Sequence, residues 1–265
     1  MKINPRFFLY PVLILVVAVV ALVQINKQQE SPSAPVVDGR KTQGISIKIP
    51  KETTITASVS AKKSSEISAG VIVTDEGDNL LVLINKNIRL PETYEPADLV
   101  SIDGLVETTH PGMMLRSEAA KTLSEMAKAA KKRDVNLMVL SAYRSYWNQE
   151  ATFSSWVGSA GFTTAETFSA RAGYSQHQLG TAVDFTAESV NLGLAEKFDT
   201  SREGKWLFAN AYKFGWVLSY PEGKEKTTGY IYEPWHWRYI GTENAQKMIQ
   251  SGLILEEFLK RFGVV

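Results

Sequence analysis

The hydrophobic positions along the chain predict a packed domain that begins near residue 79. The unbroken apolar run at residues 80–84 is typical of a buried strand. Over residues 115–133 the apolar side chains recur at helical spacing, with Lys and Glu on the opposite side, which predicts an amphipathic helix. Residues 136–142 predict a core strand, and Arg144 follows at its end.

The second half of the domain mixes short predicted strands with helices. Residues 158–176 are polar and contain glycine, as in a loop. Because no regular strand–helix–strand rhythm is present, the pattern favours an α+β fold with a small, mainly antiparallel sheet flanked by helices. The other predicted elements are helices at 147–157, 206–214 (ended by Gly215), 243–250 and 255–262, and strands at 181–185, 216–218 and 235–240.

The N-terminus carries an uncharged apolar run, Phe7 to Val23, that follows Lys2 and Arg6. As a helix rising about 1.5 Å per residue, this run would span roughly 25 Å, near the short end for crossing a bilayer. Positive residues before the run place the N-terminus in the cytoplasm and the rest of the chain outside. We therefore expect residues 1–26 to form a cytoplasmic N-terminus and a transmembrane anchor, with single-pass attachment to the cell membrane through residues 7–23.

The alternative is a protein secreted after cleavage of a signal peptide, whose apolar region is usually shorter and is followed by a small-residue cleavage site. No A-x-A pattern follows Val23, which favours the uncleaved anchor. Residues 27–78 are interpreted as an extracytoplasmic linker and N-terminal segment. Residues 27–42 have the composition of a solvated tether, and residues 45–68 predict one or two strands or an extended spacer. The folded domain is expected to cover residues 79–265.

Composition narrows the possible chemistry. The formal net charge of +1 leaves no strong basic field for a nucleic-acid backbone, so nucleic acid is not an expected partner. The chain has no cysteine, which excludes disulfides, thiolate metal sites and cysteine nucleophiles. Any metal ion must therefore be held by histidine and carboxylate side chains. At 265 residues the chain is long enough for one sizeable domain with its own core.

Two short segments gather residues that suit a metal centre. His177 and Asp184 are seven positions apart, and Glu233 and His236 are three apart, so two of the chain's three histidines fall in these segments. In a regular strand Glu233 and His236 would face opposite sides, because side chains alternate with period two. Pro234 breaks that regularity and allows Glu233 to bend toward a metal bound by His236.

Two imidazoles and one carboxylate can hold a zinc ion, and a second carboxylate is then free to move protons. Three protein ligands leave zinc a fourth position for water, whose pKa falls to about 7 when so bound. Calcium would require more oxygen ligands than these segments offer. Each residue taken singly would fit a surface histidine or a capping carboxylate, but the paired segments favour a metallohydrolase.

These segments also carry a family resemblance. The pattern Ser175-x-His177-x-x-Gly180-x-Ala182-x-Asp184, followed by Glu233-x-Trp-His236, resembles the VanY-type D-alanyl-D-alanine carboxypeptidases and their L,D-carboxypeptidase relatives, the zinc peptidases of family M15. Ser141-Ala-Tyr-Arg-Ser145 with Gln149 also matches. The resemblance covers roughly residues 79–242 and does not extend to the first seventy or so residues, apart from the general presence of an export segment.

The resemblance implies roles for the matching residues at the metal. One zinc ion per chain would be bound by His177, Asp184 and His236. Glu233 would be the general base for the attack of zinc-bound water, taking its proton and passing it to the leaving amine. Residues 79–265 would then be the zinc carboxypeptidase catalytic domain.

The resemblance also implies a substrate cleft. Arg144 would hold the substrate's carbonyl oxygen or carboxylate, for which its fixed charge and planar guanidinium are suited. Ser175, Gln149 and Tyr143 would line the peptide-binding cleft. A salt bridge is the structural alternative for Arg144, and its place at a strand end beside the other motifs argues against that role.

Several nearby residues are assigned no catalytic part. Gln176 stands where relatives often carry Glu, and Ala142 where they often carry Gly. Neither position supplies a metal ligand, so we expect activity to survive. His110 is interpreted as a loop residue, and Arg171 and Arg238 as loop or surface residues, although Arg238 could orient a ligand.

The function implied by the resemblance is removal of the terminal D-alanine from peptidoglycan stem peptides by a membrane-anchored, monomeric zinc carboxypeptidase. L,D cleavage of tetrapeptide stems stays open, as does an amidase or endopeptidase with the same metal centre. A non-catalytic cell-wall-binding module would be expected to lose Glu233 or Arg144, and both are present. A structural envelope protein would bind no zinc.

Overall fold

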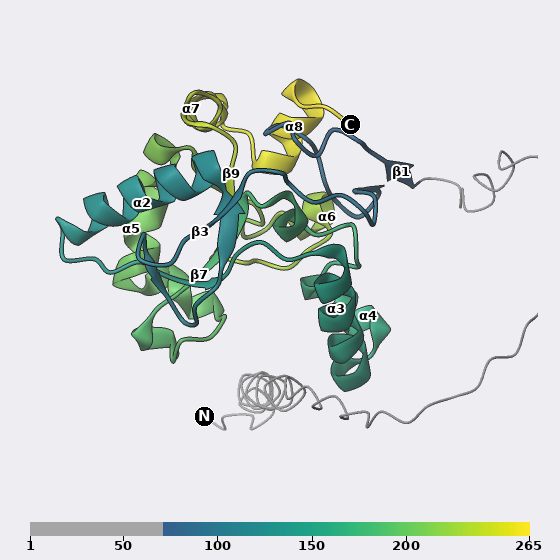
Figure 1. Ribbon diagram of the computed structural model, residues 1–265, viewed down its shortest axis with the longest axis horizontal. Coiled ribbons are helices and arrows are strands. Elements are labelled where there is room, and N and C mark those ends of the chain that lie inside the picture. Colours follow the sequence, from purple (N-terminus) through teal and green to yellow (C-terminus); the bar gives the residue numbers. More distant parts are fainter. Residues whose placement is uncertain (1–70) are drawn as a thin grey trace, which may run out of the picture. The chain divides into compact units, whose positions relative to one another are not determined.

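The computed structural model describes residues 71–265, and Figure 1 shows how their elements are arranged. These residues form a single mixed α/β domain on a five-stranded sheet with strand order β4-β6-β7-β9-β8. β4 and β6 are parallel, and the other three neighbouring pairs are antiparallel, so the sheet is mainly antiparallel as predicted. The strands are β4 (Glu107–Thr108), β6 (Met138–Ser141), β7 (Ala182–Thr186), β8 (Trp216–Leu218) and β9 (His236–Tyr239).

The described residues also contain two smaller sheets and seven α-helices. β1 (Ile72–Val73) pairs in parallel with β2 (Ile88–Arg89), and β3 (Leu99–Ser101) pairs antiparallel with β5 (Met114–Arg116). The α-helices are α2 (Ser117–Lys131), α3 (Tyr146–Ala160), α4 (Phe162–Phe168), α5 (Arg202–Asn210), α6 (Glu225–Thr228), α7 (Thr242–Ser251) and α8 (Leu255–Phe262). The 3-10 helices are η2 (Gln176–Leu179), η3 (Glu188–Val190), η4 (Glu196–Thr200) and η5 (Ala211–Phe214).

Strand alternation divides the central sheet into an apolar face and a polar face. Val183 lies opposite Trp237 in the β7–β9 register, and both belong to the main hydrophobic core. The buried stripe of α2, which includes Leu123 and Met126, belongs to the same core. In the view of Figure 1, α2 and α5 lie to the left of β7 and β9, and α3 and α4 lie to the right. In each strand, the residues next to Val183 and next to Trp237 therefore point to the opposite face of the sheet, away from this core.

The predicted strand at residues 80–84 is the clearest correction. The segment is buried as expected, but only Val82 makes a bridge, to Val264 near the C-terminus. The guanidinium of Arg238 donates hydrogen bonds to the carbonyl oxygens of Leu80 and Val82. These carbonyls therefore bond to a side chain and not to the backbone of a neighbouring strand. Arg238 itself is fully buried on β9, and the prediction that it is a loop or surface residue is wrong.

Other predicted elements differ mainly in their bounds. The segment predicted as a loop at 158–176 contains α4, which Gly161 separates from α3 with a left-handed φ of 81°. The helix predicted from residue 115 begins at Ser117, because Met114–Arg116 pair with β3. α5 begins at Arg202, earlier than predicted, because the Ser201 hydroxyl accepts a hydrogen bond from the backbone of its first turn. The strand at 216–218 and the helix at 255–262 are confirmed as predicted.

Within residues 71–265, no helix is both long and apolar enough to cross a membrane. The apolar run Phe7 to Val23 lies outside the described residues, and so do residues 27–70. The anchor and residues 27–70 of the linker therefore stay predictions from sequence, whereas the last residues assigned to the linker include β1, which pairs with β2.

Candidate metal centre

The polar face of the sheet carries two of the predicted ligands. Asp184 of β7 lies directly opposite His236 of β9 in the antiparallel register, so their side chains project from the same face. Ser141, at the end of β6, pairs with Asp184 on its other side. Three central strands therefore converge at the point where the carboxylate lies.

The third predicted ligand, His177, comes from the short turn η2. The Ser175 hydroxyl caps this turn by accepting a hydrogen bond from the backbone N–H of His177, at 3.3 Å. Gly180 ends it with a left-handed φ of 65°, which lets the chain enter β7 immediately afterwards. The loop-to-strand turn predicted at Gly180 is thus present and places His177 over Asp184.

The three side chains lie within metal-binding distance of one another. His177 Nε2 is 3.1 Å from Asp184 Oδ2, and His236 Nδ1 is 2.9 Å from Asp184 Oδ1. One ligand atom from each residue can be chosen so that all three lie within 4.8 Å of one another. The two imidazole rings are nearly perpendicular, with centroids 4.9 Å apart. All three side chains are buried.

The hydrogen bonds around the imidazoles fit a metal ion at this point. His177 Nδ1 lies 2.7 Å from the carbonyl oxygen of Ala142, which can only accept, so Nδ1 carries the proton. In the neutral ring, Nε2 then presents a lone pair to Asp184. Two lone pairs 3.1 Å apart would fit a metal cation between them, and the His–Asp–His donor set suits zinc.

The electrostatics favour the ligand forms of both residues. Burial opposes ionisation of Asp184, but its contacts with the imidazoles of His177 and His236 outweigh it and hold the pKa of Asp184 well below its usual value. Burial lowers the pKa of His236, with Asp184 opposing, so its imidazole favours the neutral form that binds metals.

Glu233 lies beside the group without belonging to it. The His236 backbone N–H donates to the carbonyl oxygen of Glu233, which closes a turn just before β9, and Glu233 Oε2 is 3.9 Å from His236 Nδ1. The bend expected at Pro234 is therefore present. Burial, and then the charge of Asp184, raise the pKa of Glu233 well above its usual value, whereas Lys86 and Arg144 act to lower it.

Arg144 is brought to the same place from the end of β6. Its Nη1 donates to Gln149 Oε1 at 2.8 Å and its Nη2 to Ser141 Oγ at 2.7 Å, while its backbone N–H donates to the carbonyl oxygen of His177. Burial lowers the pKa of Arg144, and the charges of Asp184 and Glu233 oppose this. Because it has neutral hydrogen-bond partners and forms no salt bridge with any residue of 71–265, the guanidinium keeps its charge available to a ligand.

The other predicted cleft residues have different surroundings. Gln149 is only 1% exposed, and its amide also donates to the carbonyl oxygen of Ala170, so its contact in this structure is with Arg144. Ser175 is buried and caps η2. Tyr143 is half-buried, and its hydroxyl has no hydrogen-bond partner among residues 71–265. His110 is exposed and lies in a loop, as predicted.

The structure adds neighbours that the sequence pattern did not indicate. Tyr220 packs against the His236 ring, with centroids 4.9 Å apart. Lys86 lies over the ring of Tyr230 and hydrogen-bonds the carbonyl oxygen of Glu166. Burial lowers the pKa of Lys86 to about 8. No motif surrounds Lys86 or Tyr220 in the sequence, so only tertiary packing identifies them.

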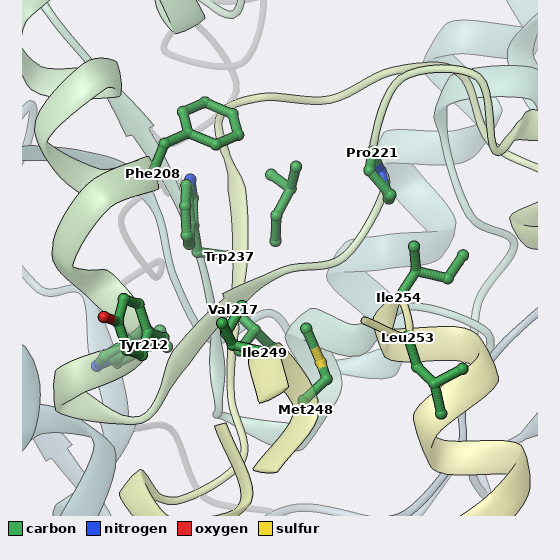
Figure 2. A pocket seen from close by; sticks show the side chains of 11 residues that line it. Phe208, Tyr212, Val217, Pro221, Trp237, Met248, Ile249, Leu253 and Ile254 are labelled. Atoms are coloured by element: carbon green, nitrogen blue, oxygen red, sulfur yellow. The ribbon is translucent and has the colours of Figure 1, made fainter. Parts of the chain in front are cut away.

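An apolar pocket of about 160 Å³ lies elsewhere in the domain. Phe208 and Trp237 sit together at one end in Figure 2, and Met248, Leu253 and Ile254 lie toward the other. Trp237 follows His236 in β9 and so projects from the opposite face of the sheet. None of the predicted site residues lines this pocket, so it is separate from the metal centre.

Comparisons with known proteins agree with this geometry. Residues 112–242 match the VanY family, described as D-alanyl-D-alanine carboxypeptidase. The chain is 33% identical over 194 residues to the D-alanyl-D-alanine carboxypeptidase of Enterococcus faecalis (strain ATCC 700802 / V583), covering 70% of this chain and 67% of the relative.

Solved carboxypeptidase and pentapeptidase structures are also similar to this chain. The LD-carboxypeptidase LdcB is 39% identical, with a TM-score of 0.67 over 72% of this chain and 90% of LdcB. A mutant of the D,D-pentapeptidase VanY from a VanB-type resistance cassette, solved in complex with Zn(II), is 32% identical, with a TM-score of 0.56 over 68% of this chain and 98% of VanY. With the His–Asp–His group in place, the chain is a zinc metallocarboxypeptidase that belongs to the VanY family of D-alanyl-D-alanine carboxypeptidases.

Proposed function

We propose that this protein removes the terminal D-alanine from peptidoglycan stem peptides that end in D-Ala-D-Ala. The observation that carries this proposal is the buried carboxylate of Glu233 beside the His177–Asp184–His236 group, with the Arg144 guanidinium at the same site. The D-alanyl-D-alanine carboxypeptidase of Enterococcus faecalis supports the substrate class through its sequence similarity.

His177, Asp184 and His236 would hold the zinc ion. A zinc ion held there supplies Lewis-acid chemistry that makes water a nucleophile near neutral pH. Glu233 accepts the proton of the attacking water and delivers it to the leaving amine. Its raised pKa makes this carboxylate a stronger proton acceptor than an exposed glutamate, which suits the first half of the transfer.

Arg144 would recognise the substrate. Gln149 and Ser141 hold two of its guanidinium nitrogens, so the side chain is fixed before the substrate arrives. A planar cation in this position can pair with the terminal carboxylate or stabilise the oxyanion that forms as the peptide carbonyl is attacked. A protein that only bound the cell wall would need neither a buried base nor this preorganised cation.

A second candidate is L,D cleavage of tetrapeptide stems. It is favoured by the similarity to the LD-carboxypeptidase LdcB, whose identity and TM-score both exceed those of the VanY structure. The two activities share the same metal chemistry and differ in the residue that precedes the scissile bond.

We also propose that the catalytic domain works outside the cytoplasmic membrane. The apolar run Phe7 to Val23 after Lys2 and Arg6 supports this location, because it would leave the rest of the chain on the wall side. Fractionation of cells would test it: a soluble, shortened protein in the medium would favour the secreted alternative.

The function is tested with four peptides and the purified zinc-loaded protein. A pentapeptide stem should lose one D-alanine, as read by mass spectrometry, and a chelator should abolish the reaction. Faster cleavage of the tetrapeptide stem would establish L,D specificity instead. Pentapeptide and tetrapeptide analogues with C-terminal amides should be inert, and their cleavage would indicate an amidase or endopeptidase.

A further inference from the structure

Gln176 links the turn that carries one predicted ligand to the strand that carries another. Its side chain is buried, and its Oε1 lies 3.2 Å from His236 Nε2, across 60 positions of sequence. The hydroxyl of Ser219, which is also buried, donates to the same oxygen at 2.7 Å. A carbonyl oxygen has two lone pairs, so it can accept both of these hydrogen bonds.

The contact between Gln176 and His236 affects which ring nitrogen of His236 is free to bind a metal. A neutral imidazole carries one proton, and the nitrogen that bears it cannot bind a metal. His236 Nδ1 faces Asp184 Oδ1 at 2.9 Å, whereas Nε2 faces the oxygen of Gln176. An acceptor at Nε2 holds the proton there and leaves the Nδ1 lone pair directed at the carboxylate.

We propose that Gln176 is a positioning residue whose amide oxygen, oriented by Ser219, keeps His236 in the form that binds zinc through Nδ1. The inference rests on the proposed zinc ligands and extends them. The turn η2 would thus serve both histidines, because it carries His177 directly and orients His236 through Gln176. His177 is oriented in a parallel way, by the carbonyl oxygen of Ala142 on its Nδ1.

Hydrogen-bond partners behind a metal ligand typically change metal affinity by about 10–100-fold when removed. Gln176→Met keeps a similar length and volume but removes the acceptor. It should weaken zinc binding by about that factor, measured by competition of the folded protein with a chromogenic chelator. Gln176→Glu restores an acceptor at the same place and should bind zinc within a few-fold of the parent protein, or more tightly.

Gln178 provides the matched control. It is a buried glutamine in the same turn, but its Nε2 donates to the carbonyl oxygens of Pro91 and Tyr94, away from His236. Gln178→Met should therefore leave zinc affinity nearly unchanged, even if it lowers the melting temperature. The visible absorption of a Co²⁺-substituted protein, which reports ligand geometry, should change in Gln176→Met and be retained in Gln178→Met.

Three outcomes would overturn the proposal: unchanged zinc affinity in folded Gln176→Met, an equal loss in Gln178→Met, or a loss of tenfold or more in Gln176→Glu. If Gln176→Met does not fold, the Gln176→Glu and Ser219→Ala variants test the proposal in its place. Ser219→Ala should weaken zinc binding several-fold, and an unchanged zinc affinity in this variant would contradict the proposal. A wrong function would appear differently, as zinc-loaded protein that binds metal as expected but releases no D-alanine.

Discussion

At the scale of single residues, the two carboxylates of the site have opposite environments. Asp184 faces two imidazoles and its pKa is lowered, whereas Glu233 is buried next to that charge and its pKa is raised. Carboxylates whose pKa values are pushed apart commonly divide the work of binding and proton transfer. The sequence contains both residues but cannot distinguish them without the motif resemblance, because burial and neighbouring charge come from the fold.

Glu233→Ala should separate proton transfer from metal binding. Because Glu233 is not one of the three predicted ligands, the variant should retain one zinc per chain while turnover falls by about 10²–10⁴-fold, the usual contribution of a general base. Zinc content by atomic emission and D-alanine release measure the two effects. Turnover near that of the parent protein would refute the role of Glu233, and lost zinc would indicate a fourth ligand instead.

Arg144→Met should impair substrate binding or turnover while zinc remains bound. The variant removes the fixed cation, so kcat/KM should fall by about 10²–10³-fold if the guanidinium stabilises the oxyanion. The separate KM and kcat values show which step depends on it. Arg171→Met is the matched control, because Arg171 also carries charge near the site but pairs with Glu166 and packs on Tyr174. A similar loss of kcat/KM in both variants would mean that the effect comes from the overall positive charge and not from the position of Arg144.

Lys86 gives a prediction about stability and pH. Burial lowers its pKa from 10.5 to about 8, with Glu166 opposing and Arg171 reinforcing the shift. Between these two pH values the unfolded chain binds the proton more tightly than the folded one, so the free energy of unfolding should rise with pH across that window. Lys86→Met should lack this rise relative to the parent protein. Urea denaturation at about pH 7.5 and about pH 10 compares the two slopes.

At the scale of elements, the position of His177 depends on Gly180. Its φ of 65° is unfavourable for residues with a side chain, and an added Cβ would lie 2.9 Å from Leu99 and 3.1 Å from Arg116. Gly180→Ala should therefore cost about 1–2 kcal/mol for the backbone alone, and more for the contacts. The loss should appear both in thermal melting and in zinc affinity.

Gly223→Ala is the control for this prediction. Gly223 has a similar φ of 72° but nothing within 4 Å of the added Cβ. It should show the backbone cost without the steric one and should bind zinc normally. Equal destabilisation in the two variants would mean that the surroundings of Gly180 yield easily and do not fix the turn.

The elements also show what a sequence can and cannot predict. The amphipathic stripe of α2 and the β7 and β9 strands follow from local periodicity, and the ligand spacing follows from the motif. Residues 80–84 have the composition of a strand, yet the distant Arg238 uses two of the segment's carbonyls. The contact between Gln176 and His236, 60 positions apart, likewise does not follow from the sequence around either residue. Both limits have the same cause, which is a polar contact between segments far apart in the chain.

At the scale of the whole molecule, the proposed zinc site should connect metal binding to global stability. Its three ligands come from η2, β7 and β9, so the site exists only when the central sheet and the preceding turn are assembled. A metal that binds the folded state alone adds about 2.7 kcal/mol of stability when its free concentration is 100 times the dissociation constant.

Removal of zinc should therefore lower the melting temperature of this domain by about 5–10 °C, given the usual 2–4 °C per kcal/mol for domains of this size. Asp184→Asn should melt at a temperature that no longer responds to zinc, because the carboxylate between the two imidazoles is lost. Differential scanning calorimetry with zinc, with a chelator, and with zinc restored measures the shift and its reversibility. A parent protein that contains zinc but melts at the same temperature without it would place the metal away from the central sheet, which would contradict the ligand set proposed above.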